Sequence, residues 1–316
     1  MNLDVIIPVY RPDEKLMRLL EGLRTQTRLP QKVLLINTDE ALFQECMRSL
    51  GVSEEELSRG FPEFELLHIE QKEFDHGGTR RRAVRRTHSE IFVMMTQDAI
   101  PANDHLLENL VWPLQDDKSP YGRVAVSYAR QLPGEDSGIF ERFSRNFNYP
   151  DRSVTKTSRS LESLGVKTFF CSDVCAAYRR DAYERLGGFV RKTIFNEDMI
   201  FAAAAIKAGY SIRYEASAQV IHAHDYTNRQ QLRRNFDLGV SQAQHPEVFA
   251  EVSSESEGKK LVAEATRHLL RERKIYLLPK FYLQCFSKYA GFWLGKRYAS
   301  LPKKWVRKLT ASPWYW

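Results

Sequence analysis

The stretch FVMMTQDAIP, residues 92–101, places a single carboxylate at the end of an apolar run. A short apolar run that is followed by polar residues is typical of a strand covered on both faces. Asp98 comes directly after that run. Ligands of open α/β sheets bind at the carboxyl ends of the strands. We therefore expect Asp98 to lie in a functional cleft, with a simple turn as the alternative.

Strands and helices alternate on both sides of this stretch. Apolar strands are predicted at 3–10, 32–37, 64–69, 92–98 and 124–127, a core segment at 169–178, and short strands at 211–214 and 219–221. Helices are predicted at 12–23, 41–50, 79–86, 103–114 and 199–208. This alternation predicts an α/β fold with a doubly wound, mostly parallel sheet. Residues 133–165 are rich in Gly, Ser, Arg and Asn, and we expect a long loop or mobile segment there.

The composition is that of an ordinary globular protein. Of 316 residues, 43% are hydrophobic and 28% are charged. No apolar run approaches the roughly 20 residues of a membrane span, and a strand is predicted directly after Met1, so no signal peptide is expected. The four cysteines have neither zinc nor disulfide-framework spacing. We expect a cytoplasmic, reduced protein.

The net charge of +7 is unevenly distributed. Residues 271–316 contain eleven Lys and Arg residues and only one acid, so this tail carries +10 and the rest of the chain about −3. The tail also contains twelve of the 37 aromatic residues. We predict two units: residues 1–226, with a nucleotide-binding half of about 1–100 and an acceptor half of about 101–226, and a helical extension of residues 227–316.

Four motifs follow one another at plausible distances. They are IIPVY at 6–10, the strand that ends at Asp98, LGGF at 186–189 and Asn-Glu-Asp at 196–198 before a helix. Together they resemble the family-2 nucleotide-sugar glycosyltransferases of the GT-A fold, over roughly residues 3–225. FDHGGTR at 74–80 and TQDA at 96–99 are similar to elements of bacterial rhamnosyltransferases, although Arg81 stands where Asn is more usual.

The resemblance implies a divalent cation, Mg²⁺ or Mn²⁺, that offsets charge on a departing nucleoside diphosphate. The Asp-x-Asp metal motif of the family corresponds here to Thr96-Gln97-Asp98, without its first carboxylate. Asp98 is then the main protein ligand, and the resemblance suggests His224 as a second one. His222 alternates with His224 along a strand and is expected to face the other way.

The family places its catalytic base at the Asp of the Glu-Asp pair. Asp198 fits this role, because a helix start stabilises an anion and one base must deprotonate the acceptor hydroxyl. Glu197 is expected to help orient the acceptor. The alternative is that both acids only cap the Ala-rich helix.

Further residues are assigned to the donor. Pro8, Tyr10 and Asp39 sit at the ends of predicted strands and, by the resemblance, hold the nucleobase and ribose; Gln97 is placed beside them. The remaining candidates are His76, Gly77, Gly78 and Arg80 near the diphosphate, with a place beside the base as the alternative for Arg80. Asp173 is expected near a sugar or simply buried and hydrogen-bonded. Arg81, Arg82, Arg85 and Arg86 are expected to form a solvated helix face.

The tail combines basic residues with Trp and Tyr, as helices on anionic membranes do. Packing on the catalytic unit or in a homo-oligomer is the alternative, and nucleic acid is not expected because no binding fold accompanies the charge. The resemblance thus implies a metal-dependent inverting transferase, peripheral at the inner face of the cell membrane. It would transfer L-rhamnose from dTDP-L-rhamnose to a lipid-linked saccharide in surface-polysaccharide synthesis. The alternatives are a UDP-hexose donor or a non-catalytic sugar-nucleotide-binding scaffold.

Overall fold

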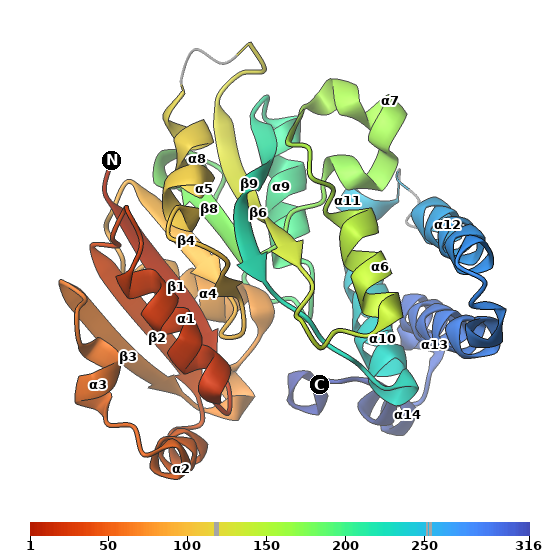
Figure 1. Ribbon diagram of the computed structural model, residues 1–316, viewed down its shortest axis with the longest axis horizontal. Helices are drawn as coiled ribbons and strands as arrows, with labels where there is room; N and C mark the ends of the chain where they lie inside the picture. The colour runs from red at the N-terminus through yellow and green to blue at the C-terminus, as the bar shows by residue number, and fades with distance from the viewer. Residues whose placement is uncertain (117–119, 251, 253–254) are drawn as a thin grey trace.

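The computed structural model describes residues 1–116, 120–250, 252 and 255–316, which form one sheet flanked by helices (Figure 1). The strands are β1 Leu3–Val9, β2 Lys32–Thr38, β3 Glu63–Ile69, β4 Ile91–Met95, β5 Ile100–Pro101, β6 Val124–Leu132, β7 Val154–Lys156, β8 Cys175–Arg179 and β9 Ser211–Ile221. The first helices are α1 Glu14–Arg24, α2 Glu40–Leu50, α3 Glu54–Ser58, α4 His76–Val84, α5 Leu106–Gln115, α6 Ile139–Asn148, α7 Leu161–Leu164, α8 Arg180–Arg185 and α9 Glu197–Lys207. The C-terminal helices are α10 Asn228–Gln244, α11 Pro246–Phe249, α12 Glu255–Arg271, α13 Leu278–Lys296 and α14 Lys303–Leu309.

The sheet has a parallel half and a mixed half. Its strand order in the described residues is β3-β2-β1-β4-β8-β6-β9-β5, with β7 paired to β9. β1, β2, β3 and β4 are parallel neighbours, and β6 is parallel to β9, whereas β8 is antiparallel to β4 and β6. The predicted α/β fold is confirmed. The carboxyl ends of β1, β2 and β4 share one edge, where Tyr10, Asp39 and Asp98 follow them.

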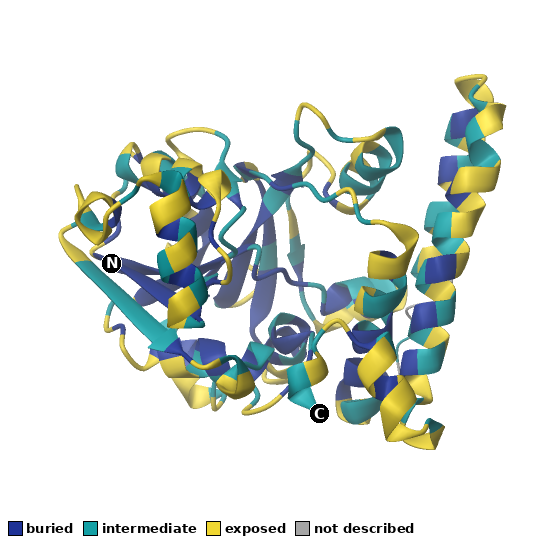
Figure 2. Cartoon of the chain, turned by 90° about the horizontal axis from the view of Figure 1, so that it is seen from below, coloured by how far each residue is buried: buried dark blue, intermediate teal, exposed yellow. Residues whose placement is uncertain are grey.

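Successive side chains of the central strands enter two different cores, as the pleat of a strand requires. Val5 and Val93 face the cluster that α1, α2, α3 and α5 cover, whereas Ile6, Phe92 and Met94 face the one under α4, α8, α9 and α11. Figure 2 shows the central strands as buried, the edge strand β3 as mostly intermediate and the flanking helices as exposed on their outer sides. The near-continuous apolar character of these strands follows from this double coverage.

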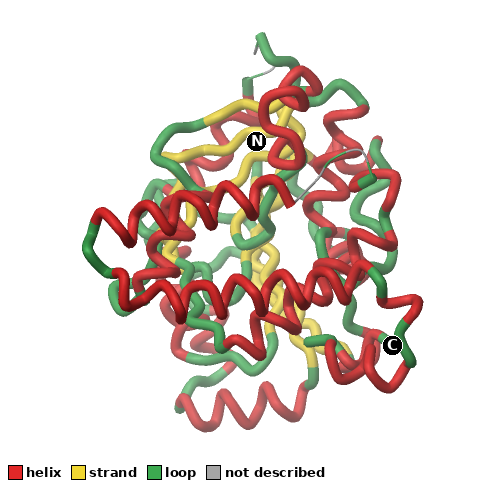
Figure 3. The backbone as a smooth tube through the Cα atoms, turned by 90° about the vertical axis from the view of Figure 1, so that its right-hand side faces the viewer, coloured by secondary structure: helices red, strands yellow, loops and turns green. Residues whose placement is uncertain are grey.

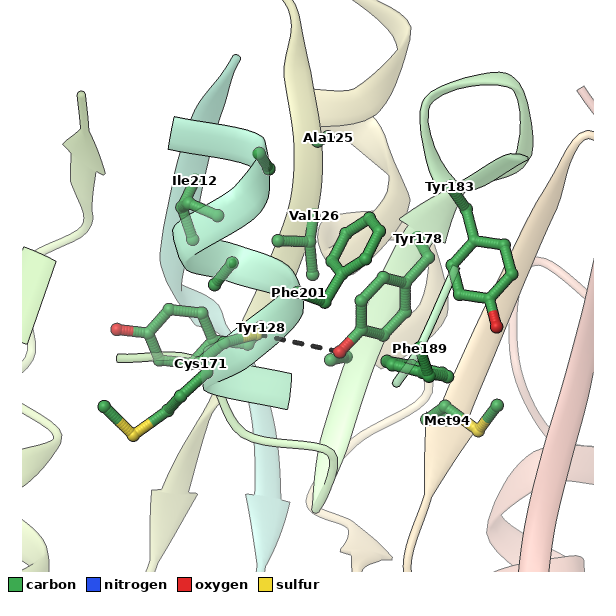
Figure 4. Packing of buried hydrophobic residues seen from close by; sticks show 14 of the residues in the cluster. Met94, Ala125, Val126, Tyr128, Cys171, Tyr178, Tyr183, Phe189, Phe201 and Ile212 are labelled. Carbon is green, nitrogen blue, oxygen red and sulfur yellow. Dashed lines mark hydrogen bonds between the residues drawn. The ribbon is translucent and has the colours of Figure 1, made fainter. Parts of the chain in front are cut away.

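An aromatic cluster fills the second core beside β8 (Figure 4). Tyr178 stacks on Phe92 with ring centroids 5.2 Å apart and meets Phe189 and Phe201 edge-on at 5.2 and 5.4 Å. Its hydroxyl donates to Asp173 Oδ1 at 2.5 Å. A buried tyrosine usually has a hydrogen-bond partner for its hydroxyl. Through this bond the aromatic core contacts Asp173, one of the candidate site residues.

The prediction of a long loop over residues 133–165 is wrong. β6 extends to Leu132, and α6, β7 and α7 occupy much of the segment. Phe140 and Phe143 of α6 pack with Phe281 and His268, which are more than a hundred residues away. Because the partner of the apolar side of α6 is so distant, local sequence pattern gave little signal. The two strands predicted at 211–214 and 219–221 are one strand, β9, whose register against β6 shifts.

The C-terminal helices α10 and α13 pack closely on one another through glycine residues. A Cβ on Gly291 of α13 would lie 2.1 Å from the carbonyl oxygen of Leu232 on α10, and Gly295 approaches Phe236 equally closely. The aromatic side of α13 therefore faces outward. Its exposed residues are Tyr282, Leu283, Phe286, Tyr289 and Trp293.

Residues 227–316 also share the core of the preceding unit. Val248 and Phe249 of α11 belong to the same cluster as the strands, and Ile194 joins Phe236 and Val240 of α10. The domain boundary near residue 226 stays a prediction. None of the described helices is both long enough and apolar enough to cross a membrane.

Candidate active site

Asp98, His222 and His224 converge beyond the ends of β4 and β9, and we call them the ligand triad. Asp98 Oδ2 lies 2.9 Å from His224 Nε2, and Oδ1 lies 3.5 Å from His222 Nε2. The two Nε2 atoms are 2.9 Å apart, and the possible ligand atoms all lie within 4.8 Å of one another. A carboxylate and two imidazoles at this spacing are suited to one divalent cation.

The prediction that His222 faces away from His224 is wrong. Side chains alternate only within a strand, and β9 ends at Ile221. The two rings meet edge-on with centroids 4.6 Å apart. On its other side, the His224 ring stacks on Tyr226 at 4.8 Å.

Gln131 of β6 fixes the protonation of His222. Its Nε2 donates to Tyr149 Oη at 2.6 Å and to Ser172 Oγ at 2.9 Å, and its Oε1 accepts from Arg145 Nη1. Because arginine only donates, that oxygen also accepts from His222 Nδ1, 3.0 Å away. His222 Nε2 then presents a lone pair to the carboxylate of the triad. A lone pair that faces a carboxylate is repelled by it, whereas a cation bound between them would be attracted to both. The residues of the triad therefore fit a divalent metal.

The protonation states of the triad suit the binding of a divalent metal. Burial raises the pKa of Asp98, but the neighbouring imidazoles of His222 and His224 outweigh it and hold this pKa well below its usual range. Burial lowers the pKa of His222 to about 4. A metal needs an ionised carboxylate and neutral imidazole as ligands, and these are the states of Asp98 and His222 near neutral pH.

Asp198 lies in the first turn of α9. Its carboxylate accepts N–H bonds from Met199 at 2.7 Å and from Asp173 at 3.1 Å. Burial, followed by repulsion from Glu197 and Asp173, raises the pKa of Asp198 well above its usual range. A carboxylate whose pKa moves toward neutrality is a stronger base, so this group can accept a proton from a hydroxyl.

Glu197 and Asp173 hold the buried guanidinium of Arg80 between them. Arg80 Nε lies 3.1 Å from Glu197 Oε1 and 3.2 Å from Asp173 Oδ2. Burial raises the pKa of Glu197, but the charge of Arg80 outweighs it and lowers this pKa to about 2. Burial raises the pKa of Asp173 to about 7. Three carboxylates thus surround one arginine, and Asp198 is the one without a direct ion pair to it.

Two predicted donor contacts match the alternatives given for them. Arg80 is 5% exposed and paired with carboxylates, so it lies beside the proposed base Asp198, which was the alternative to a diphosphate contact. Asp173 is likewise buried and hydrogen-bonded, which was the alternative for a sugar contact. His76 joins this cluster, with Nδ1 3.7 Å from Glu197 Oε1.

Gly77 and Gly78 serve close packing. A Cβ on Gly77 would lie 2.2 Å from the carbonyl oxygen of Val190, and one on Gly78 would lie 2.5 Å from Asp75 Oδ2. The Gly78 N–H donates to Asp75 at 2.7 Å, and the His76 N–H donates to a backbone carbonyl. These two amides already have partners within the protein, and the phosphate contact of this turn stays a prediction. Arg81 is also not simply solvated, because it donates to backbone carbonyls of residues 187 and 189.

The predicted nucleoside residues line the edge of the sheet. Gln97 accepts the Tyr10 N–H at 2.8 Å and donates to the Tyr10 carbonyl at 3.0 Å, so it ties the ends of β1 and β4 together. Pro8 lies within β1. Asp39 caps α2 from a left-handed backbone conformation, φ 72°, and such strained residues concentrate at functional sites.

The C-terminus returns to this edge. The ring of Trp314 lies 6.5 Å from that of Tyr10, and Gln71 donates to the Tyr10 hydroxyl at 3.4 Å. Packing of the tail on the catalytic unit was the alternative to a membrane role, but the sequence did not predict this approach to Tyr10. A chain terminus that is distant in sequence gives no local sign of where it docks.

One hydrogen-bonded path connects the two halves of the site. Gln131 bonds His222 on one side and Ser172 on the other, and the residue after Ser172 bonds Asp198 through its N–H. Sequence reasoning missed His222, Gln131 and Ser172. The His-x-His spacing after a strand was a usable signal for His222, whereas a lone glutamine or serine in a strand or loop carries none.

Comparisons with known proteins agree with this geometry. The sequence model of glycosyl transferase family 2 matches residues 4–187. The chain is 34% identical over 320 residues to the O-antigen chain rhamnosyltransferase RfbN of Salmonella typhimurium, covering 100% of this chain and 96% of that protein. It is 39% identical over 253 residues to the O-antigen chain rhamnosyltransferase WbaN of Salmonella anatum, covering 79% and 78%.

Solved structures show the same fold. The mannosyltransferase PcManGT of Pyrobaculum calidifontis, in complex with GDP-Man and Mn²⁺, aligns with a TM-score of 0.53 and 16% identity over 99% of this chain and 85% of that one. S. aureus TarS 1–349 aligns with a TM-score of 0.51 and 14% identity over 98% and 83%. The family match and the relatives of nearly equal length lead to one conclusion: this chain belongs to glycosyl transferase family 2.

Proposed function

We propose that the chain is an inverting rhamnosyltransferase that moves L-rhamnose from dTDP-L-rhamnose to a lipid-linked saccharide in surface-polysaccharide synthesis. The observation that carries the chemistry is the pairing of a cation-ready triad with a base of raised pKa, joined by one hydrogen-bonded path. The sugar is proposed from the two O-antigen chain rhamnosyltransferases, whose similarity extends over most of the chain.

The residues divide the work between leaving group and nucleophile. Asp98, His222 and His224 would hold a divalent cation, which offsets the charge of a departing nucleoside diphosphate. Asp198 accepts the proton of the attacking acceptor hydroxyl. Arg80 keeps Glu197 ionised beside it, and that second negative charge is one reason the pKa of Asp198 is raised. Tyr10 and Asp39, at the ends of neighbouring strands, are placed to meet the nucleoside.

The donor is tested first by thermal shift of the full chain with Mn²⁺ and dTDP, UDP or GDP. The proposal expects the largest rise in melting temperature with dTDP, and a larger rise with UDP would favour the hexose alternative. Transfer is then measured with radiolabelled dTDP-L-rhamnose, and the product's anomeric configuration is read by NMR. Donor binding without metal-dependent transfer or hydrolysis would favour the scaffold alternative.

Membrane attachment is the second part of the proposal. It is supported by the exposed aromatic side of α13 and the basic residues around it. Deleting residues 275–316 would uncover Phe236 and Val240 of the α10 core, so point substitutions are the better test. Trp293→Ser with Trp305→Ser, both at exposed positions, should weaken cosedimentation with anionic vesicles.

Trp112→Ser is the matched control, because Trp112 is exposed on α5 outside the C-terminal extension. The control should cosediment like the unchanged protein. Equal binding of the double variant and the control would contradict attachment through the extension.

A further inference from the structure

An apolar groove of about 890 Å³ lies between α6, α10, α12 and α13. Its walls are mainly aromatic and aliphatic, and they include Phe140, Phe143, Leu238, Val262 and Phe286. This volume is in the range of ligand pockets, which are lined mostly by apolar side chains with a few polar groups. Figure 3 shows α12 and α13 crossing one face of the molecule side by side, joined at one end.

Packing of α13 explains why the groove stays open. The helix approaches α10 through Ser287, Gly291 and Gly295, which are buried. Its larger side chains are thereby directed to the groove and to the outer surface. Phe286 lines the groove and is still 64% exposed, so an apolar ligand would remove substantial apolar surface from water.

The groove adjoins the ligand triad across a single helix, α6. Phe140 and Phe143 face the groove, whereas Glu141 and Arg145 face the site. Arg145 donates to Gln131, and the Glu141 carboxylate lies 3.5 Å from the backbone nitrogen of His224. A molecule that lies in the groove would therefore have one end beside the residues that position the triad.

The charge around the groove selects an anionic ligand. Lys288 and Lys259 line it. Burial lowers the pKa of Lys288, and the charges of Glu141 and Arg145 on α6 are near enough to act on it as well, so Lys288 lies toward the α6 end of the groove. The tail from residue 271 onward carries eleven basic residues and one acid. Two copies of this face would repel each other, which disfavours a second chain as the occupant.

We infer that this groove binds the hydrocarbon chain of the acceptor, with the anionic diphosphate of that lipid at the Lys288 end. The inference rests on the proposed function and adds the place where the lipid is recognised. Hydrocarbon would contact the aromatic walls, and the cations would meet the diphosphate. The saccharide would then extend past α6 toward Asp198 and the triad.

Chain length gives a direct test by calorimetry on the full chain without donor. The probes are inorganic diphosphate and the dimethylallyl, geranyl and farnesyl diphosphates. Each methylene that becomes buried should strengthen binding about fourfold, so affinity should rise steeply along the series. Affinity independent of chain length would mean that only the diphosphate is bound, and would overturn the inference.

Two tryptophan substitutions on α13 locate the binding site. Cys285→Trp fills the groove, whereas Leu283→Trp adds the same side chain at a position that is 54% exposed and outside the groove lining. Farnesyl diphosphate should bind at least tenfold more weakly to the first variant and normally to the second. Equal binding by two variants with unchanged melting temperatures would refute the groove.

Thiol labelling of Cys285 tests the groove by a second route if Cys285→Trp does not fold. In a Cys46→Ser background, Cys285 is the half-buried thiol, while Cys171 and Cys175 are buried. Farnesyl diphosphate should slow its labelling, and inorganic diphosphate should not. Labelling at an unchanged rate when farnesyl diphosphate is bound would place the lipid elsewhere. A dimer that dissociates on labelling would identify a second chain as the occupant.

Failure of the groove and failure of the proposed function give different results. Chain binding is measured without donor, and transfer is measured with an acceptor saccharide on a short soluble aglycone. Transfer without chain-length-dependent binding would remove the groove and keep the enzyme. Chain binding without transfer of rhamnose would keep the groove and remove the proposed donor.

Discussion

Asp198→Asn separates catalysis from helix capping more sharply than any other substitution in the site. Asparagine preserves the shape but cannot accept a proton, and loss of a general base costs about 10²- to 10⁴-fold in rate. This equals about 3 to 5 kcal/mol of activation free energy. Donor affinity should stay unchanged, because the contacts of Asp198 are to the backbone N–H groups of Met199 and Asp173. Single-turnover transfer and a separate donor titration measure the two quantities.

Although Asp198→Asn should lose activity, its free energy of unfolding should rise relative to that of the wild type as pH increases. One of the two N–H bonds is lost, which costs about 1 kcal/mol. Against this, the pKa of Asp198 is raised in the folded protein, and each unit of that shift means about 1.4 kcal/mol of destabilisation by the ionised group. The folded state holds its proton more tightly than the unfolded state, so wild-type stability falls as pH rises above about 4. The variant has no such titration, so its free energy of unfolding relative to that of the wild type should increase between pH 5 and pH 8. Urea unfolding at the two pH values measures this difference.

Glu197→Gln is the control with the reverse expectation. The pKa of Glu197 is lowered to about 2, so its charge stabilises the fold above the ordinary carboxyl range and this stabilisation is lost as pH falls toward 2. Removing one partner of a buried ion pair costs about 3 to 5 kcal/mol. The reasoning would be refuted if Asp198→Asn transferred sugar at nearly the normal rate, or if it lost stability equally at both pH values.

Three further substitutions, the last with a matched control, test the remaining contacts of the site and the C-terminal helices. His222→Asn should weaken Mn²⁺ binding at least tenfold, measured by calorimetry with the metal alone. An unchanged affinity would show that His222 is not a metal ligand beside Asp98. Gln131→Leu should weaken the same binding about 10- to 100-fold through loss of imidazole orientation, the usual effect of an outer hydrogen-bond partner. Gly291→Val should cost about 1 to 3 kcal/mol of unfolding free energy, because its Cβ would lie 2.1 Å from a backbone carbonyl oxygen. Gly258→Ala on α12, whose Cβ would meet nothing within 4 Å, should leave the melting temperature close to normal.

The sheet could be predicted because its strands carry their own signal. Each central strand is buried on both faces, so its residues form an apolar run that needs no knowledge of partners. Asp98 followed from the same run, since chain direction alone puts it at the carboxyl edge. Asp198 was proposed as the base from the family resemblance, which its position at a helix start supports.

The residues that were misjudged depend on distant partners. Gly77 and Gly78 suggested a phosphate loop, but a packed segment more than a hundred residues later explains them. For Arg80 the sequence left a phosphate contact and a place beside the base both open, and the two carboxylates that the fold brings around it favour the second. His222 was misplaced because the alternation rule was carried past the end of its strand. Sequence supplies residue types along a chain, whereas these roles are set by contacts across it.

The same dependence on distant contacts joins the C-terminal extension to the proposed base. Asn196 precedes Glu197 and Asp198 in a left-handed conformation, φ 65°, which is costly for a residue other than glycine. Ser241 of α10 supports it by accepting from the Asn196 amide at 3.1 Å and donating to the Phe195 carbonyl at 2.6 Å. α13 in turn packs against α10 at backbone contact distance. The helix that lines the groove is therefore coupled through α10 to the turn that carries Asp198, so a lipid held there would be presented to the base by a continuous, closely packed structure.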